Sequence, residues 1–272
     1  MQYARLGRTG LEVSRICLGC MSCGDASQGR QWVLGLDEAR PVLRAAWDAG
    51  INFYDTANVY SAGTSEEITG TVLWELARRD EVVLATKVNG EMRRGPNGKG
   101  QSRKAILSEI DNSLRRLKTD YVDLYQIHRF DYATPIEETL EALHDVVKMG
   151  KARYIGASSM WAWQFIKMLA TQKANGWTQF VSMQNQLYDP NAAEDEKINK
   201  AIDQVAKAKG NTMAQIALAW VLQKKPVTAP IVGVTRIEQL TDAVGALSVD
   251  LGDDDVTALE AAYHPRVPAG FQ

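Results

Sequence analysis

The sequence predicts a single α/β domain over residues 1–272, with the architecture of a (β/α)8 TIM barrel and a β-hairpin at its N-terminus. Apolar, β-branched strand segments alternate with amphipathic helical segments along the chain, a pattern that demands a parallel sheet covered by helices. Polar residues stand at the C-terminal ends of the predicted strands, the face where such barrels gather their chemistry. No G-x-G-x-x-G follows the first strand, which disfavours an open, doubly wound dinucleotide-binding sheet. No low-complexity linker divides the chain, so one domain is expected.

The hairpin is the first element, because residues 2–7 and 11–19 flank a glycine-containing turn and lead into the first strand. Strands are then predicted near 16–20, 51–57, 81–88, 121–128, 152–158, 178–185 and 228–234. Helices are predicted over 38–50, 65–80, 102–118, 134–151, 161–174, 194–210, 212–225, 236–247 and 253–263. Pro41 in the first turn and Gly50 at the end delimit the first helix, and Ser102 is the expected N-cap of the third. The strands number seven, one fewer than a closed (β/α)8 barrel requires.

The composition is that of an ordinary globular protein. The chain is 45% hydrophobic and 24% charged, and its formal net charge is −2. Because there is no basic surplus, neither nucleic acid nor an anionic membrane is an expected partner. The N-terminus has no apolar signal-peptide core, and no segment approaches 18 continuous apolar residues. A cytoplasmic location is therefore expected.

The three cysteines, Cys17, Cys20 and Cys23, are spaced C-x2-C-x2-C. A zinc or iron–sulfur site would need a fourth ligand, but there is no fourth cysteine and the three histidines are over a hundred residues away. We therefore predict no metal, and reduced thiols on a buried strand and the loop after it. An odd number of cysteines also argues against a disulfide framework.

Polar side chains end five of the predicted strands: Asp55, Lys87, His128, Ser158 and Gln184. A barrel brings these ends to one pocket, and Tyr60 follows the second strand closely. A buried carboxylate and ammonium need pairing, and an ammonium beside a tyrosine favours the phenolate. Each residue alone has a plain structural explanation, as a cap, a surface charge or a core histidine. Together they predict a general acid that protonates an oxyanion as hydride arrives at carbon.

Four segments carry a resemblance to a known family: "GINFYDTANVYSAGTSEE" (50–67), "ATKV" (85–88), "DLYQIH" (123–128) and "YIGASS" (154–159). They resemble the aldo-keto reductases, in the branch related to the channel-associated β subunits, and the resemblance runs over nearly the whole chain. It implies that the catalytic tetrad of the family falls on Asp55, Tyr60, Lys87 and His128. It also implies reduction of aldehydes or ketones to alcohols with NADPH, which the family binds without a Rossmann motif.

The resemblance places the cofactor along the same face of the barrel. Its nicotinamide carboxamide would lie against Ser158, Ser159 and Gln184. The family usually has asparagine where this chain has Ser159, and a hydroxyl replaces only one of the two amide hydrogen bonds. Further contacts carried over by the resemblance are Gly19, Met21, Asp55, Gly233, Thr235, Arg236 and Gln239. The segment from Gly233 opens a helix, which suits the adenosine 2′-phosphate, and Arg236 would favour NADP over NAD.

The family resemblance also accounts for the count of seven strands. Relatives have a helix, a seventh strand and a long loop after the segment that matches "QNQ" (184–186), and none of these is in this sequence. Either the protein lacks the block or the printed sequence omits it. We favour omission, because a barrel without one internal strand exposes two unpaired edges. In that case Gln186 and Leu187 would not be neighbours in space.

Other functional classes remain open on the residues. A redox-sensing regulatory subunit on the same scaffold would also keep the tetrad. A metal-dependent barrel hydrolase would need more strand-end histidines than His128. The expected partner is a small carbonyl substrate, with the oligomeric state open. Four aromatic residues are candidates for lining its pocket: Trp32, Tyr54, Trp161 and Trp163.

Overall fold

The structure is a computed structural model, and it describes residues 1–28, 30–185 and 192–264. Its strands are β1 (Tyr3–Arg5), β2 (Glu12–Ser14), β3 (Cys17–Gly19), β4 (Phe53–Asp55), β5 (Val83–Val88), β6 (Val122–Ile127), β7 (Ala152–Ser158), β8 (Phe180–Gln184) and β9 (Ile231–Gly233). Its α-helices are α1 (Leu36–Asp48), α2 (Thr64–Leu76), α3 (Arg103–Leu117), α4 (Ile136–Lys148), α5 (Ala162–Ala174), α6 (Ala192–Lys209), α7 (Met213–Gln223), α8 (Ile237–Gly245) and α9 (Asp253–Glu260). The alternation of strands and helices predicted from the sequence is confirmed.

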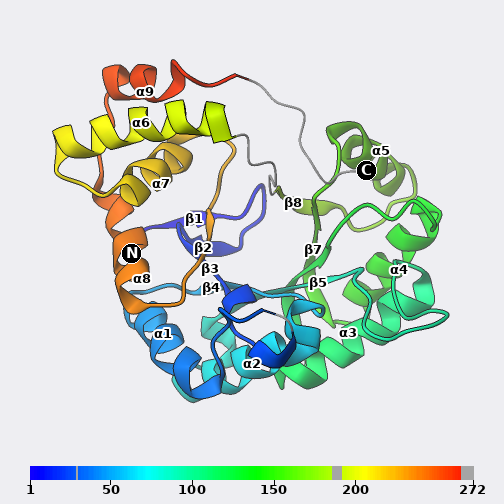
Figure 1. Ribbon diagram of the computed structural model, residues 1–272. Helices are drawn as coiled ribbons and strands as arrows, with labels where there is room; N and C mark the ends of the chain where they lie inside the picture. Colours follow the sequence, from blue (N-terminus) through cyan, green and yellow to red (C-terminus); the bar gives the residue numbers. More distant parts are fainter. Residues whose placement is uncertain (29, 186–191, 265–272) are drawn as a thin grey trace.

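Seven parallel strands form one curled sheet in the order β8-β7-β6-β5-β4-β3-β9. The helices lie around the outside of this sheet, as expected of a (β/α)8 barrel (Figure 1). In the part of the chain that the structure describes, β8 and β9 are the two edges, since no strand lies between them. The sheet is therefore open where the seventh barrel strand is expected. The junction at Gln186 and Leu187 is outside the described residues.

The predicted N-terminal hairpin is confirmed. β1 and β2 pair antiparallel, with Tyr3 opposite Ser14 and Arg5 opposite Glu12. Two of its apolar side chains, Leu6 and Val13, pack with Phe53, Leu124 and other strand residues in a small cluster of buried side chains. The hairpin therefore contributes to the packing of the sheet interior.

The main core lies between the sheet and the surrounding helices. Leu43 of α1, Leu73 of α2, Ile106 of α3 and Leu143 of α4 are all fully buried in it. Burying one such side chain contributes roughly 1.5–3 kcal/mol. This apolar layer fixes the strands, and hence the residues at their C-terminal ends, in place.

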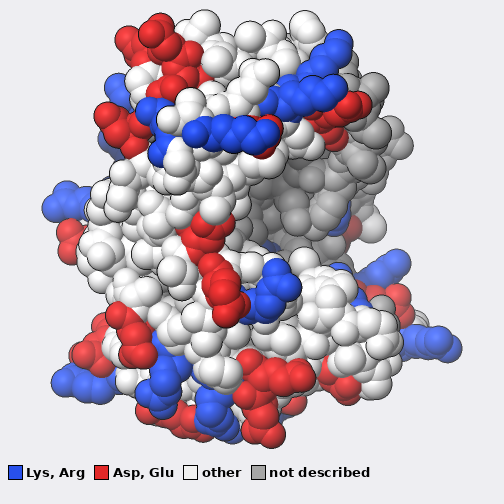
Figure 2. Space-filling view, turned by 60° about the vertical axis from the view of Figure 1, so that its left-hand side comes forward, with Lys and Arg blue, Asp and Glu red and all other residues white. Residues whose placement is uncertain are grey.

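The surface carries mixed charge. Figure 2 shows Lys and Arg side chains interspersed with Asp and Glu side chains over the face that it presents. Among the described residues, no helix is long and apolar enough to cross a membrane.

Candidate active site

A buried ion pair forms the centre of the site. Lys87, near the end of β5, and Asp55, the last residue of β4, are both at most 2% exposed. The Lys87 Nζ donates one hydrogen bond to Asp55 Oδ2 and a second, of 2.9 Å, to the Thr56 carbonyl. Burial by itself lowers the pKa of the Lys87 ammonium, but Asp55 and Tyr60 outweigh it, and the pKa is raised. The lysine is therefore held as a cation without access to solvent.

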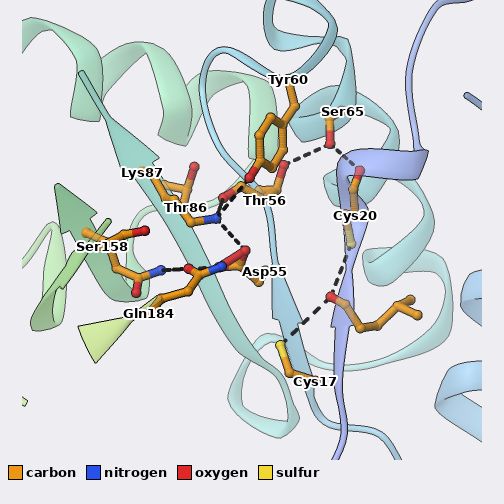
Figure 3. A network of polar contacts seen from close by, with 12 residues as sticks. Cys17, Cys20, Asp55, Thr56, Tyr60, Ser65, Thr86, Lys87, Ser158 and Gln184 are labelled. Atoms are coloured by element: carbon orange, nitrogen blue, oxygen red, sulfur yellow. Dashed lines mark hydrogen bonds and ion pairs between the residues drawn. The ribbon is translucent and has the colours of Figure 1, made fainter. Parts of the chain in front are cut away.

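Tyr60 meets the third hydrogen-bonding position of this ammonium. Its hydroxyl oxygen lies 3.4 Å from Lys87 Nζ, and the centroid of its ring lies 5.1 Å from the same atom. Asp55, Lys87 and Tyr60 thus come together as the strand-end argument predicted, and Figure 3 shows the carboxylate, the ammonium and the phenol converging from different segments. An ammonium against the phenol oxygen stabilises negative charge there.

The loop that carries Tyr60 has an unusual backbone. Ser61, Ala62 and Gly63 all have positive φ, at 46°, 52° and 102°. Two of these are not glycine, and a left-handed conformation costs such residues roughly 1–2 kcal/mol each. The loop is held from two sides: a Cβ on Gly24 would collide with Ser61, and one on Gly63 would lie 2.7 Å from Arg116 Cδ. The surrounding structure therefore enforces the conformation that presents Tyr60.

His128 completes the group. It follows β6, and its ring meets that of Tyr60 edge-on, with centroids 5.6 Å apart. Burial lowers the pKa of His128 to about 3, with further lowering by the positive charges of Lys87 and Arg129. The imidazole is therefore neutral at physiological pH, so it can donate or accept a hydrogen bond but holds no spare proton.

Two polar supports of the site were not predicted. Gln126, on β6 and 2% exposed, donates from Nε2 to Asp55 Oδ1 at 3.1 Å. It stands two residues before His128, and alternate residues of a strand share a face, so its place in the site could have been predicted from the sequence.

Glu66, fully buried on α2, accepts from Arg116 Nε at 2.6 Å and from Thr86 Oγ1 at 2.5 Å. This second pair lies directly behind the strand of Lys87.

The residues assigned to the nicotinamide lie on two neighbouring strands. Ser158, the last residue of β7, is in register with Gln184, the last of β8. Ser158 Oγ lies 3.2 Å from Ser159 Oγ, and the Ser159 amide donates to the Gln184 carbonyl at 3.0 Å. Ser159 has a positive φ of 49°, which asparagine tolerates better than serine. An amide and two hydroxyls at adjacent strand ends suit a carboxamide, with one amide fewer than the family pattern.

The residues assigned to the phosphate end lie at β9 and α8. Gly19 and Gly233 are in register across the β3–β9 pair, and a Cβ at Gly233 would meet nothing within 4 Å. Arg236 is the N-cap residue of α8, and the amides of Thr235 and Arg236 donate to Gln239 Oε1 at 2.9 and 3.2 Å. An exposed arginine at a helix N-terminus is suited to a phosphate. Met21, which the resemblance also assigns to the cofactor, lies in the short helix after β3. The residues present therefore fit both ends of a dinucleotide.

Two further predictions concern Tyr54 and the cysteines. Tyr54 does not line a pocket: it is fully buried in the core between sheet and helices, and its hydroxyl donates to the Ile51 carbonyl at 3.0 Å. The reason is strand alternation, because Asp55 points to the opposite face.

The cysteines are buried free thiols, as predicted. Among the described residues, no group of His, Cys, Asp or Glu is placed to hold a metal ion.

Comparison with known proteins gives a consistent result. A family model described as the aldo/keto reductase family matches residues 15–200 and 188–264. Aldo-keto reductase AMT2 of Alternaria alternata is 35% identical over 344 positions, covering 98% of this chain and 93% of the relative. Versiconal hemiacetal acetate reductase of Aspergillus parasiticus is 35% identical, covering 98% of each chain. A putative aryl-alcohol dehydrogenase of Schizosaccharomyces pombe is also 35% identical, covering 97% of this chain and 96% of the relative.

The alignments with relatives are longer than this chain, and the family match indicates where the difference lies. The alignment with the Alternaria protein spans 344 positions, whereas this chain has 272 residues, so at least 72 positions have no counterpart here. The two segments matched by the family model meet between residues 188 and 200. The break thus falls after β8, where the sheet is open.

Proposed function

We propose that this chain, which belongs to the aldo/keto reductase family, reduces aldehydes or ketones to alcohols with NADPH, and that Tyr60 is the proton donor. Membership of this family makes the chain an oxidoreductase of the carbonyl-reducing kind. The observation that carries the proposal is the contact of one buried ammonium, Lys87, with both Asp55 and the Tyr60 hydroxyl.

NADPH, when bound, supplies a hydride to the carbonyl carbon. The residues of this chain then manage the charge that develops on the carbonyl oxygen. Tyr60 donates its proton to that oxygen, and the Lys87 ammonium stabilises the phenolate left behind. Asp55 fixes the position of Lys87. Because His128 is neutral, it orients the carbonyl by a hydrogen bond and leaves the proton transfer to Tyr60.

The residues that would hold the cofactor fall into two groups. Ser158, Ser159 and Gln184 would bind the nicotinamide carboxamide, and Gly19, Met21 and Asp55 would line its path. Gly233, Thr235, Arg236 and Gln239 would bind the adenosine 2′-phosphate. The donors at the two strand ends and the arginine at the start of α8 support this assignment.

The names of two relatives suggest the first substrates to try. One is named a putative aryl-alcohol dehydrogenase and the other a versiconal hemiacetal acetate reductase. We therefore propose aromatic aldehydes as a substrate class for this chain, with simple aliphatic aldehydes for comparison.

The test is Tyr60→Phe, followed by the loss of NADPH absorbance with these aldehydes. Removing a general acid should lower turnover roughly a hundredfold or more, while NADPH binding, followed by fluorescence, stays near that of the natural protein. Tyr263→Phe, at a side chain that is 56% exposed, is the matched control. Near-normal turnover in Tyr60→Phe would exclude the assigned role. NADPH binding without turnover in the natural protein would instead favour the redox-sensing regulatory subunit.

A further inference from the structure

A single buried amide joins the catalytic group to the residue assigned to the nicotinamide. Gln126 Nε2 donates to Asp55 Oδ1 at 3.1 Å and lies 3.5 Å from Gln184 Oε1. Gln126 is 2% exposed and comes from β6, between the strand of Lys87 and that of Ser158. The Nε2 group of Gln126 therefore faces an acceptor oxygen on each side, one from Asp55 and one from Gln184.

The charges at one end fix the direction of every hydrogen bond in this chain of contacts. Asp55 is paired with the Lys87 ammonium through Oδ2, so its carboxylate is an acceptor. The amide of Gln126 must then turn its NH2 group, and not its oxygen, towards Asp55. The reverse orientation would place an amide oxygen against a carboxylate oxygen, which is repulsive.

The same constraint passes to Gln184. The NH2 group of Gln126 has two N–H donors, and the one not used by Asp55 faces the Gln184 side chain. Only the oxygen of the Gln184 amide can accept it. The Gln184 NH2 group is thereby turned away from Gln126 and is left to meet a ligand. Without Gln126, nothing in this set of contacts would distinguish the two amide orientations.

We propose that Gln126 is a positioning residue that fixes the amide orientation of Gln184 for binding the nicotinamide carboxamide. The inference rests on the proposed function, since it takes NADPH as the ligand. It adds to that function a residue that touches neither the substrate nor the cofactor. It also makes the affinity for the nicotinamide depend on the ion pair between Lys87 and Asp55, because Asp55 sets the orientation of Gln126.

The experiment compares two ligands in Gln126→Leu. NADPH carries the nicotinamide, whereas 2′,5′-ADP carries only the phosphate end assigned to Arg236. We expect the dissociation constant of NADPH to rise about 3- to 10-fold, as for one lost hydrogen bond, and that of 2′,5′-ADP to stay the same. The 2′,5′-ADP measurement also reports whether the variant is folded. Gln126→Glu, an acceptor where a donor is needed, should weaken NADPH binding at least as much.

A double-mutant cycle separates positioning from a general structural effect. If Gln126 acts through Gln184, then Gln126→Leu should have no further effect on NADPH binding in a Gln184→Leu background. Additive losses, or equal losses for NADPH and 2′,5′-ADP, would overturn the inference and leave the proposed function standing. Failure of the natural protein to bind NADPH at all would instead defeat the proposed function.

Discussion

Replacing Arg116 by methionine tests the buried ion pair behind the site. Glu66 is fully buried, and the Arg116 side chain is 16% exposed. Without Arg116, the Glu66 carboxylate keeps the Thr86 hydroxyl as a donor but loses its neutralising charge. Breaking such a pair by removing one partner costs about 3–5 kcal/mol. This is a large share of the roughly 5–15 kcal/mol that stabilises a typical domain.

The stability lost in Arg116→Met should depend on pH in a definite direction. Burial raises the pKa of Glu66, and Arg116 is the main influence that lowers it again. In Arg116→Met the pKa in the folded state therefore rises further above its unfolded value. A raised carboxyl pKa destabilises the fold as pH rises through it, because the folded state must then bury the charge. The loss of stability should be largest at neutral pH and should shrink on acidification, as Glu66 takes up a proton.

Urea unfolding of the natural protein and the variants at two pH values is the assay. We expect Glu66→Gln to restore most of the lost stability when combined with Arg116→Met, because it removes the unpaired charge. The matched control is Arg103→Met on the same helix, whose partner Asp145 lies 2.5 Å away in a half-exposed pair. That change should cost about 0–1 kcal/mol. A cost below about 1 kcal/mol for Arg116→Met, or no rescue by Glu66→Gln, would refute the argument.

Three further predictions address the cofactor, the histidine and the missing block. Arg236→Met should raise the Michaelis constant for NADPH but not for NADH, by the equivalent of about 1.5–3 kcal/mol for a lost charged hydrogen bond; equal constants for the two cofactors in the natural protein would contradict the assignment. The pKa of His128 is about 3 in the fold against 6.5 for a free histidine, so its contribution to stability is present above pH 6.5 and is lost as pH falls towards 3. His128→Asn should therefore lose less stability than the natural protein between pH 6 and pH 4, as followed by circular dichroism, and an identical pH profile would count against this. Finally, we expect the intact mass of the natural protein to exceed the 30.1 kDa of the printed chain by several kilodaltons, and a measured mass of 30.1 kDa would show a true deletion.

The strand-end residues could be predicted because two regularities are strict. Parallel strands present their C-terminal ends at one face, which was enough to bring Asp55, Lys87 and His128 together. The second regularity is the alternation of side chains along a strand. It would have placed Gln126 on the same face as His128, and it would have turned Tyr54 away from the face of Asp55.

Other features of the site could not be predicted from local sequence. Ser61 and Ala62 are not residue types that favour positive φ, and only the packing around them enforces it. The pairing of Glu66 with Arg116 joins two helices whose register depends on the whole core. A charged residue on a predicted helix gives no indication that it is turned inward, because charged residues are mostly exposed.

The position of β3 in the sheet has a consequence for how the chain folds. The strands from β3 to β8 are hydrogen-bonded in the order in which they are synthesised, so the sheet can grow by one strand and helix at a time. β9 breaks this order, because it returns from the last part of the sequence to pair with β3, with Ile231 beside Cys17. Contacts between such distant residues form slowly, and until then the free edge of β3 can pair with another chain. The β3 edge therefore stays open to another chain until β9 arrives, and a chaperone that covers this edge would matter most before then.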